Sequence, residues 1–154
     1  MLEKKRAGAL TNQGHGVEWN LWHGTSEEII QQIVTKGFNR SFVIHISFSL
    51  LTVGKKYGQG VYFAKEAHYS ARPGYAVPNP NGNQHTFLCR VLVGLFTLGS
   101  KDMVEPPPID AQKSVVDTYD STVDDMANPR IFASCFIDHH AYPDYLIVFN
   151  TTKL

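Results

Sequence analysis

The first clear hydrophobic pattern in the chain has a period of two and then changes to the period of a helix. Residues 19–23 alternate between two sides, which predicts a short strand. Apolar residues then recur at helical spacing over 29–34, after hydroxyl and acidic residues typical of a helix start, and we expect Thr25 to cap this helix. Gly37 predicts its end, because glycine readily adopts a positive φ.

Further along, short apolar segments are separated by glycine and proline. They predict a helix over 65–71 and strands over 60–64, 85–96, 119–121, 131–136 and 145–149. The prolines of Val104–Ile109 exclude a helix or a central strand, and a rigid surface connector is favoured over a polyproline recognition segment. Strands outnumber helices without regular alternation, so the pattern favours an α+β fold.

Composition limits the class of protein. The chain has 154 residues, of which 43% are hydrophobic and 18% charged, enough for one compact domain. Fourteen basic and fourteen acidic residues cancel, so no net charge favours binding to nucleic acid or an anionic membrane. Cys89 and Cys135 lie in apolar runs, which indicates buried thiols in a reducing compartment. The longest apolar run, Phe42–Val53, is too short and too polar to span a bilayer.

Two glycine-containing segments are candidates for a ligand site. The loop Gly54–Gly60 could expose backbone donors to phosphate, but it lacks the P-loop and dinucleotide fingerprints, so a surface turn is an equal alternative. His23 lies at a predicted strand end, a common place for site residues, although a lone histidine is more often structural. Gly24 has no side chain and would let a planar ligand lie against its backbone.

Aromatic residues gather after the second predicted strand. Tyr62, Tyr69 and Tyr75 could sandwich a flat ring, with the hydroxyl of Ser70 fixing its orientation. Any one of these tyrosines could instead be ordinary core packing, but the whole arrangement favours a binding site.

A metal site is the weaker interpretation of the pair His139-His140, with Asp138 and Asp144 nearby. Adjacent histidines point to opposite faces of an extended segment, and a third ligand at suitable spacing is missing, so we favour a solvated turn and expect no metal. The sequence also contains no serine or cysteine nucleophile motif.

Six segments taken in order resemble the catalytic domain of the poly(ADP-ribose) polymerase family. They are NLWHGT, KGFNRSF, YGQGVYFAKEAHYSA, VLVGLFTLGS, YDSTVDD and AYPDYLIVF, and together they extend from about Trp19 to Phe149. The resemblance is strongest to the mono-ADP-ribosyltransferase branch found in macrodomain-bearing members. It implies the ADP-ribosyltransferase fold, with split, mainly antiparallel sheets and short flanking helices.

The resemblance also implies roles for individual residues. His23 would hydrogen-bond the adenosine ribose of NAD, and the backbone of Gly24 would pair with the nicotinamide carboxamide. The stacking tyrosine of the Gly-x-Tyr-Phe-Ala motif matches Tyr62, and the second stacking tyrosine matches Tyr75. The serine that completes carboxamide recognition matches Ser70.

The position of the polymerase glutamate falls on Ile131. Cleavage of nicotinamide from ribose builds positive charge on the sugar, which a carboxylate would stabilise. Isoleucine cannot do so, and a missing interaction of this type costs roughly 3 kcal/mol, about a hundredfold in rate. We therefore expect elongation to fail and single transfer to survive. The catalytic positions implied are His23, Tyr62 and Ile131, the last without an acid–base role.

The expected function is NAD-dependent transfer of one ADP-ribose unit to protein glutamate or aspartate, with nicotinamide released. NAD is a co-substrate and no metal is needed. Expected partners are NAD and protein acceptors, without direct contact to nucleic acid or membrane, in the nucleus and/or cytoplasm, and within a longer multidomain chain. The alternative is a catalytically inert binding module of the same fold with a disrupted donor loop.

Two departures from the family pattern define the expected domain limits. Residues 1–18 are predicted to be a loose tail and 19–150 the catalytic domain, N-terminally truncated because another strand and helix normally precede the Trp19 region. The family pattern passes almost directly from Ser41-Phe42 to the glycine loop. Residues 43–53 are therefore interpreted as an atypical insert, such as a translated intron, that disfavours closure of the cofactor pocket.

Overall fold

A computed structural model describes residues 18–38, 56–134, 136 and 140–153 of the chain. The expected loose tail before residue 18, the insert at 43–53, Cys135, Asp138 and His139 therefore lie outside the described residues. The strands are β1 (Glu18–Thr25), β2 (Val61–Ala64), β3 (Gln84–Leu92), β4 (Phe96–Leu98), β5 (Pro108–Asp110), β6 (Ser114–Thr118), β7 (Ser121–Val123), β8 (Ile131–Ser134) and β9 (Ala141–Phe149). The helices are α2 (Glu27–Lys36), α5 (Ala67–Ser70) and the 3₁₀ turn η1 (Thr151–Lys153).

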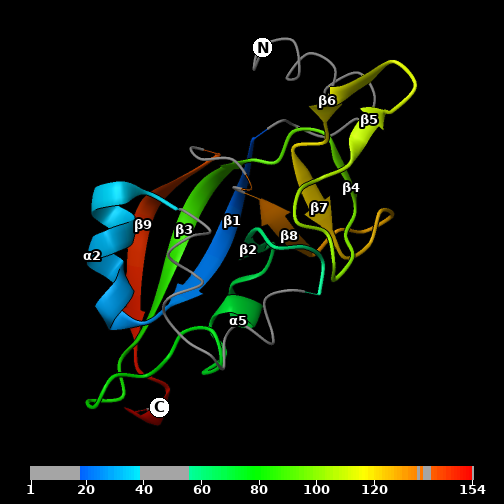
Figure 1. Cartoon of the computed structure of the whole chain (residues 1–154). Helices are drawn as coiled ribbons and strands as arrows, with labels where there is room; N and C mark the ends of the chain where they lie inside the picture. Colours follow the sequence, from blue (N-terminus) through cyan, green and yellow to red (C-terminus); the bar gives the residue numbers. More distant parts are fainter. Residues whose placement is uncertain (1–17, 39–55, 135, 137–139, 154) are drawn as a thin grey trace.

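Most of these strands form a seven-stranded sheet in the order β4-β7-β8-β2-β1-β3-β9, and β5 and β6 form a separate hairpin. Among the described strands, β4 and β7 pair in parallel and the other paired strands are antiparallel. Figure 1 shows α2 on one side of the molecule and the hairpin on the other, with α5 next to β2. The expected α+β fold with a mainly antiparallel sheet is confirmed.

The hydrophobic core lies on one face of the sheet. Alternation along the strands sends Leu21, Phe63, Phe87 and Phe132 to this face, where Ile33 of α2 joins them. Each such side chain contributes about 1.5–3 kcal/mol when it is fully buried. Burial therefore fixes which residues of β1 and β2 face the core and which face the opposite side.

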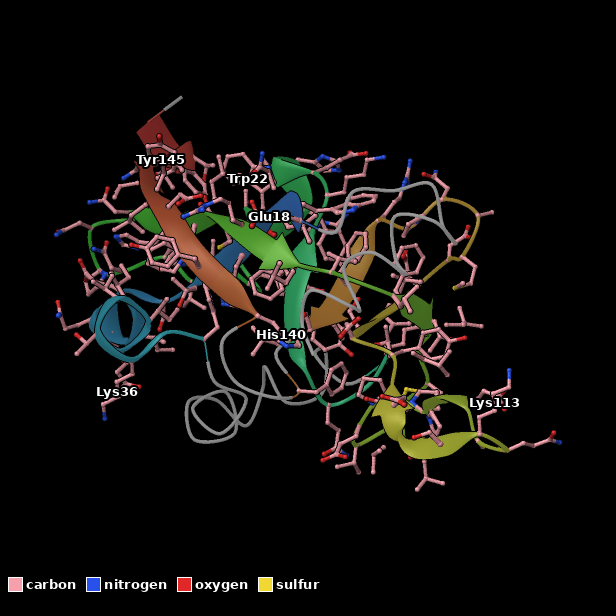
Figure 2. The ribbon with its side chains drawn as sticks, turned by 90° about the horizontal axis from the view of Figure 1, so that it is seen from above. Glu18, Trp22, Lys36, Lys113, His140 and Tyr145 are labelled. Carbon is pink, nitrogen blue, oxygen red and sulfur yellow. The ribbon has the colours of Figure 1, made fainter. Side chains whose placement is uncertain are left out.

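The opposite face carries a different set of residues. Trp22 is paired with Ala64 of β2 and with Leu88 of β3, and Leu88 is paired with Tyr145 of β9. Because cross-strand partners share a face, Trp22 and Tyr145 lie on the same side of the sheet, as Figure 2 shows. The short helix α5 packs against β1 and β2.

Several local predictions are confirmed and others are wrong. Gly37 ends α2 with φ 75°, and its N–H donates to the carbonyl of Ile33 at 2.8 Å. Thr25 is not the cap: it is the last residue of β1, held in the ladder opposite His85, and Ser26 takes the cap position without a side-chain bond.

Several predicted elements differ from their expected ranges. The strand expected over 119–121 begins only at Ser121, as β7. The helix expected over 65–71 is the single turn α5. The strand expected over 85–96 is divided into β3 and β4, because Gly94 has φ 58° and turns the chain between them. The proline segment contributes only Pro108 and Ile109 to the separate β5–β6 hairpin, which agrees with the exclusion of a central strand.

No helix among the described residues is long and apolar enough to cross a membrane.

Candidate active site

His23 lies near the end of β1 and is fixed by one hydrogen bond and two rings. Its Nδ1–H donates to the carbonyl of Tyr62 at 2.7 Å, which leaves Nε2 as an acceptor. Phe38 and Phe63 contact the imidazole, with ring centroids 5.1 Å and 5.5 Å away. Burial lowers the pKa of His23 below 6.5, and the bond to Tyr62 only partly opposes this shift. The imidazole is therefore neutral near pH 7, and its Nε2 can accept a hydrogen bond from a ligand.

Tyr62 of β2 holds the loop that precedes it. Its hydroxyl donates to the carbonyl of Gly58 at 2.7 Å and accepts the N–H of Tyr57 at 2.8 Å. Burial is the main cause that raises the pKa of Tyr62 to about 12, so the phenol remains protonated. Since the hydroxyl is occupied by the loop, the ring is the part of Tyr62 that can contact a ligand.

The described part of the glycine-rich loop is packed against the protein. A Cβ on Gly60 would lie 2.6 Å from the carbonyl oxygen of Ser134, and one on Gly58 would lie 3.2 Å from Phe136. The N–H groups of Tyr57 and Gln59 already donate to protein oxygens. These two amides are not free to cradle phosphate, while Gly54 and Lys55 lie outside the described residues.

Gly24 lets a second segment approach β1 closely. A Cβ there would lie 2.2 Å from the carbonyl oxygen of Ser70 and 2.9 Å from the nitrogen of Ala76. The buried hydroxyl of Ser70 donates to the carbonyl of Trp22 at 3.0 Å. Any side chain at position 24 would push this segment away, so the glycine brings Ser70 and Tyr75 beside the strand.

The sequence predicts that three tyrosines sandwich a flat ligand ring, but in the structure two of them stack on each other. Tyr69 and Tyr75 stack on each other with centroids 5.2 Å apart, and their hydroxyls are 3.0 Å apart. Arg72 lies over the Tyr69 ring at 4.5 Å. Burial, followed by the bond to Tyr69, raises the pKa of Tyr75 well above its usual range. Tyr69 is thus a partner of the predicted stacking residue.

Ile131 begins β8 opposite Ala64, and only 7% of its surface is exposed. Residues two apart on a strand share a face, so Tyr62 and Ile131 lie on the same face of the β2–β8 pair. The carboxylate of Asp124 accepts the N–H groups of Ile131 and Arg130 at 3.0 Å and 2.9 Å. This carboxylate anchors the start of β8.

Comparison with known proteins identifies the family. The sequence profile of the poly(ADP-ribose) polymerase catalytic domain matches residues 3–153. The chain belongs to this family. It is 38% identical over 136 residues to the human "Protein mono-ADP-ribosyltransferase PARP14", and 42% identical over 135 residues to "Protein mono-ADP-ribosyltransferase PARP10" of Mus musculus. These matches cover 86% and 88% of the chain but only 7% and 13% of the relatives.

A solved structure supports the fold of this poly(ADP-ribose) polymerase family member. The crystal structure of the PARP domain of Arabidopsis RADICAL-INDUCED CELL DEATH1 matches it with a TM-score of 0.63 at 20% identity. The match covers 97% of this chain and 76% of that one. The catalytic-domain fold implied by the sequence motifs is therefore confirmed.

Two supporting residues of the family member's site were missed in the sequence. Gln84, at the start of β3, is buried and bonds to the segment that carries Ser70 and Tyr75. Thr122 donates to the carbonyl of Tyr57 at 2.6 Å and holds the glycine loop. In the sequence, each of these two residues stands out only as a polar residue within or beside an apolar strand. This pattern does not show which distant groups the residue binds.

The described residues that were considered as metal ligands do not form a common site. Asp144 accepts a bond from Nε of Arg90 at 2.8 Å, and His140 lies just before β9, where its carbonyl accepts the N–H of Leu92. His139 and Asp138 lie outside the described residues. Within the described ranges, no group of three or more His, Cys, Asp or Glu side chains could hold a metal ion.

Proposed function

We propose that this family member transfers a single ADP-ribose unit from NAD to a protein acceptor and releases nicotinamide. The main support is that Ser70 and Tyr75 lie beside Gly24, while Ile131 shares a face of the sheet with Tyr62. Several relatives that are 34–42% identical over most of this chain are named protein mono-ADP-ribosyltransferases. A carboxylate is absent from the position of the polymerase glutamate.

NAD would contact both ends of this site. The Nε2 acceptor of His23 suits a ribose hydroxyl of adenosine, since Nδ1–H is used by Tyr62. The nicotinamide carboxamide would pair with the backbone of Gly24 and the hydroxyl of Ser70, while Tyr62 and Tyr75 present rings to its flat face. The depressed pKa of His23 supports the role as acceptor, because an imidazolium has no lone pair to offer.

The chemistry follows from which groups are available. The bond between ribose C1′ and the nicotinamide nitrogen breaks, and its electron pair leaves with nicotinamide. An acceptor carboxylate then bonds to C1′. Ile131 offers no charge to stabilise the positive sugar or to activate a ribose hydroxyl as the next acceptor, so the product stops at one unit.

We also propose the wider setting. Protein glutamate or aspartate would be the acceptor, without a metal, and nucleic acid or membrane would not be a direct partner. Because the chain spans a small part of its curated relatives, acceptor choice would depend on other parts of a longer protein. A location in the nucleus and/or cytoplasm is part of the same proposal.

Incubation of the purified chain with labelled NAD tests the proposal. We expect nicotinamide release and a modified protein whose mass increases by single ADP-ribose units at separate sites, with the label removed by agents that cleave ester bonds. Long polymer would contradict single transfer. Calorimetric binding of benzamide, a nicotinamide mimic, without any transfer would instead support the inert binding module.

A further inference from the structure

Gln84 is one of the largest fully buried side chains in the described structure, with 1% of its surface exposed. It is the first residue of β3, and both N–H bonds of its amide are used. The Nε2 group donates to the carbonyl of Ala71 and to the carbonyl of Ala76, each at 2.9 Å. The Oε1 atom accepts the hydroxyl of Thr151 at 2.9 Å.

Each of the two carbonyls that Gln84 binds belongs to the residue directly after a predicted nicotinamide-binding residue. Ala71 directly follows Ser70, and Ala76 directly follows Tyr75. Between them the chain makes its own turn, in which the N–H groups of Tyr75 and Ala76 both donate to the carbonyl of Arg72. That turn fixes the internal shape of the segment, whereas the amide of Gln84 fixes its place relative to the sheet.

We propose that Gln84 is a positioning residue for the nicotinamide end of the site, acting through Ser70 and Tyr75. This inference rests on the proposed function. Glutamine suits the task because one amide nitrogen supplies two donors for two carbonyls. The bond from Thr151 fixes which way the amide faces. A buried carbonyl that loses its donor is costly, so removal of the amide shifts the segment toward other partners.

The substitution Gln84→Met tests this role, because it keeps the length of the side chain and removes its polar atoms. Two probes are titrated by calorimetry: benzamide, which reports on the nicotinamide end, and ADP-ribose, which lacks nicotinamide. We expect benzamide to bind roughly tenfold more weakly, since small misplacements of site groups have effects of this size or larger. Binding of ADP-ribose should change by less than about twofold, because a loss confined to one end leaves the other intact.

Asn150→Leu is the matched control. The Asn150 amide also holds a turn, with Nδ2 donating to the carbonyl of Asn81 and to Oδ1 of Asn83 rather than to the segment that carries Ser70 and Tyr75. Benzamide affinity should stay unchanged in this variant. Equal weakening of benzamide by both variants, or of both probes by Gln84→Met, would overturn the positioning role.

A milder variant decides the question if Gln84→Met does not fold. Thr151→Val removes the bond that orients the Gln84 amide, and we expect benzamide to bind roughly threefold more weakly, as expected for one neutral hydrogen bond. Unchanged benzamide binding would then overturn the inference. If the unaltered chain binds ADP-ribose but not benzamide, the proposed function itself fails. If the unaltered chain binds benzamide and the variants bind it equally well, only the role of Gln84 fails.

Discussion

In the folded protein, the environment of His23 favours an imidazole with a single proton, on Nδ1. Nδ1–H is committed to the Tyr62 carbonyl, and burial disfavours a second proton on Nε2. The imidazole therefore keeps one donor with a protein partner and one acceptor for a ligand. The side chain can bind a ribose hydroxyl without any change of protonation near neutral pH.

A pH titration of stability tests this state of His23. Its folded pKa lies below the unfolded value of 6.5, so the unfolded chain binds more protons in that window and stability rises with pH through it. The stability that the neutral imidazole contributes is fully present above pH 6.5 and is lost as the pH falls toward the folded pKa. We expect His23→Gln to flatten this part of the profile of unfolding free energy, measured in urea between about pH 5 and pH 8. Parallel profiles for the two proteins would contradict the lowered pKa.

Gly24 gives a steric prediction at the same scale. In Gly24→Ala the new Cβ meets the backbone of Ser70 and Ala76, which cannot move like the end of a side chain. We expect the free energy of unfolding to fall by about 1–3 kcal/mol in urea denaturation, and benzamide binding to weaken.

Gly74→Ala provides the control for this substitution. Gly74 lies in the same segment, but a Cβ there would meet nothing within 4 Å. Stability should change little, within about 0.5 kcal/mol. A similar loss in both variants would show that any side chain disturbs the segment, rather than the contact at Gly24.

At the scale of elements, the start of β8 depends on one carboxylate. Asp124 accepts two backbone N–H groups, those of Arg130 and Ile131. We expect Asp124→Ala to lower the free energy of unfolding by about 1–2 kcal/mol and to speed hydrogen exchange of the Ile131 amide. Asp124→Asn keeps an acceptor oxygen and should lose less. Equal losses for the two substitutions would show that charge, and not the hydrogen bonds, anchors the strand.

Elements formed by local patterns could be predicted from the sequence. The alternation in β1, the helical spacing in α2 and the glycine after it are all visible within a few residues. The division of one expected strand at Gly94 could not be predicted with the same security, because a glycine within a strand pattern is also compatible with a bulge. The parallel pairing of β4 with β7 is equally hidden, since it joins segments separated by a hairpin.

The candidate site shows the same limit. His23, Tyr62, Ser70 and Tyr75 were found because each belongs to a recognisable motif, although their proposed roles remain predictions. The stacking of Tyr69 on Tyr75 and the amide of Gln84 were not found, since they depend on how a loop lies in space.

For the whole molecule, the proposed chemistry needs no metal ion. Asp144, one of the residues considered as a ligand, is paired with Arg90. We expect excess EDTA to leave the rate of ADP-ribose transfer from labelled NAD unchanged, with a zinc-dependent enzyme as the positive control for chelation. Loss of activity that added zinc restores would favour the metal-dependent alternative built on His139 and His140.

The backbone of β1 separates the two halves of the site. The imidazole of His23 contacts the core ring of Phe63, while the next residue, Gly24, faces Ser70 on the other side. Because β1 is paired with β2 and β3 on its two edges, a ligand that reaches both must pass the end of the strand, so each half can be filled by a separate small molecule. Joining two such fragments with a linker that passes the end of β1 should therefore raise affinity through effective concentration alone, without any new contact.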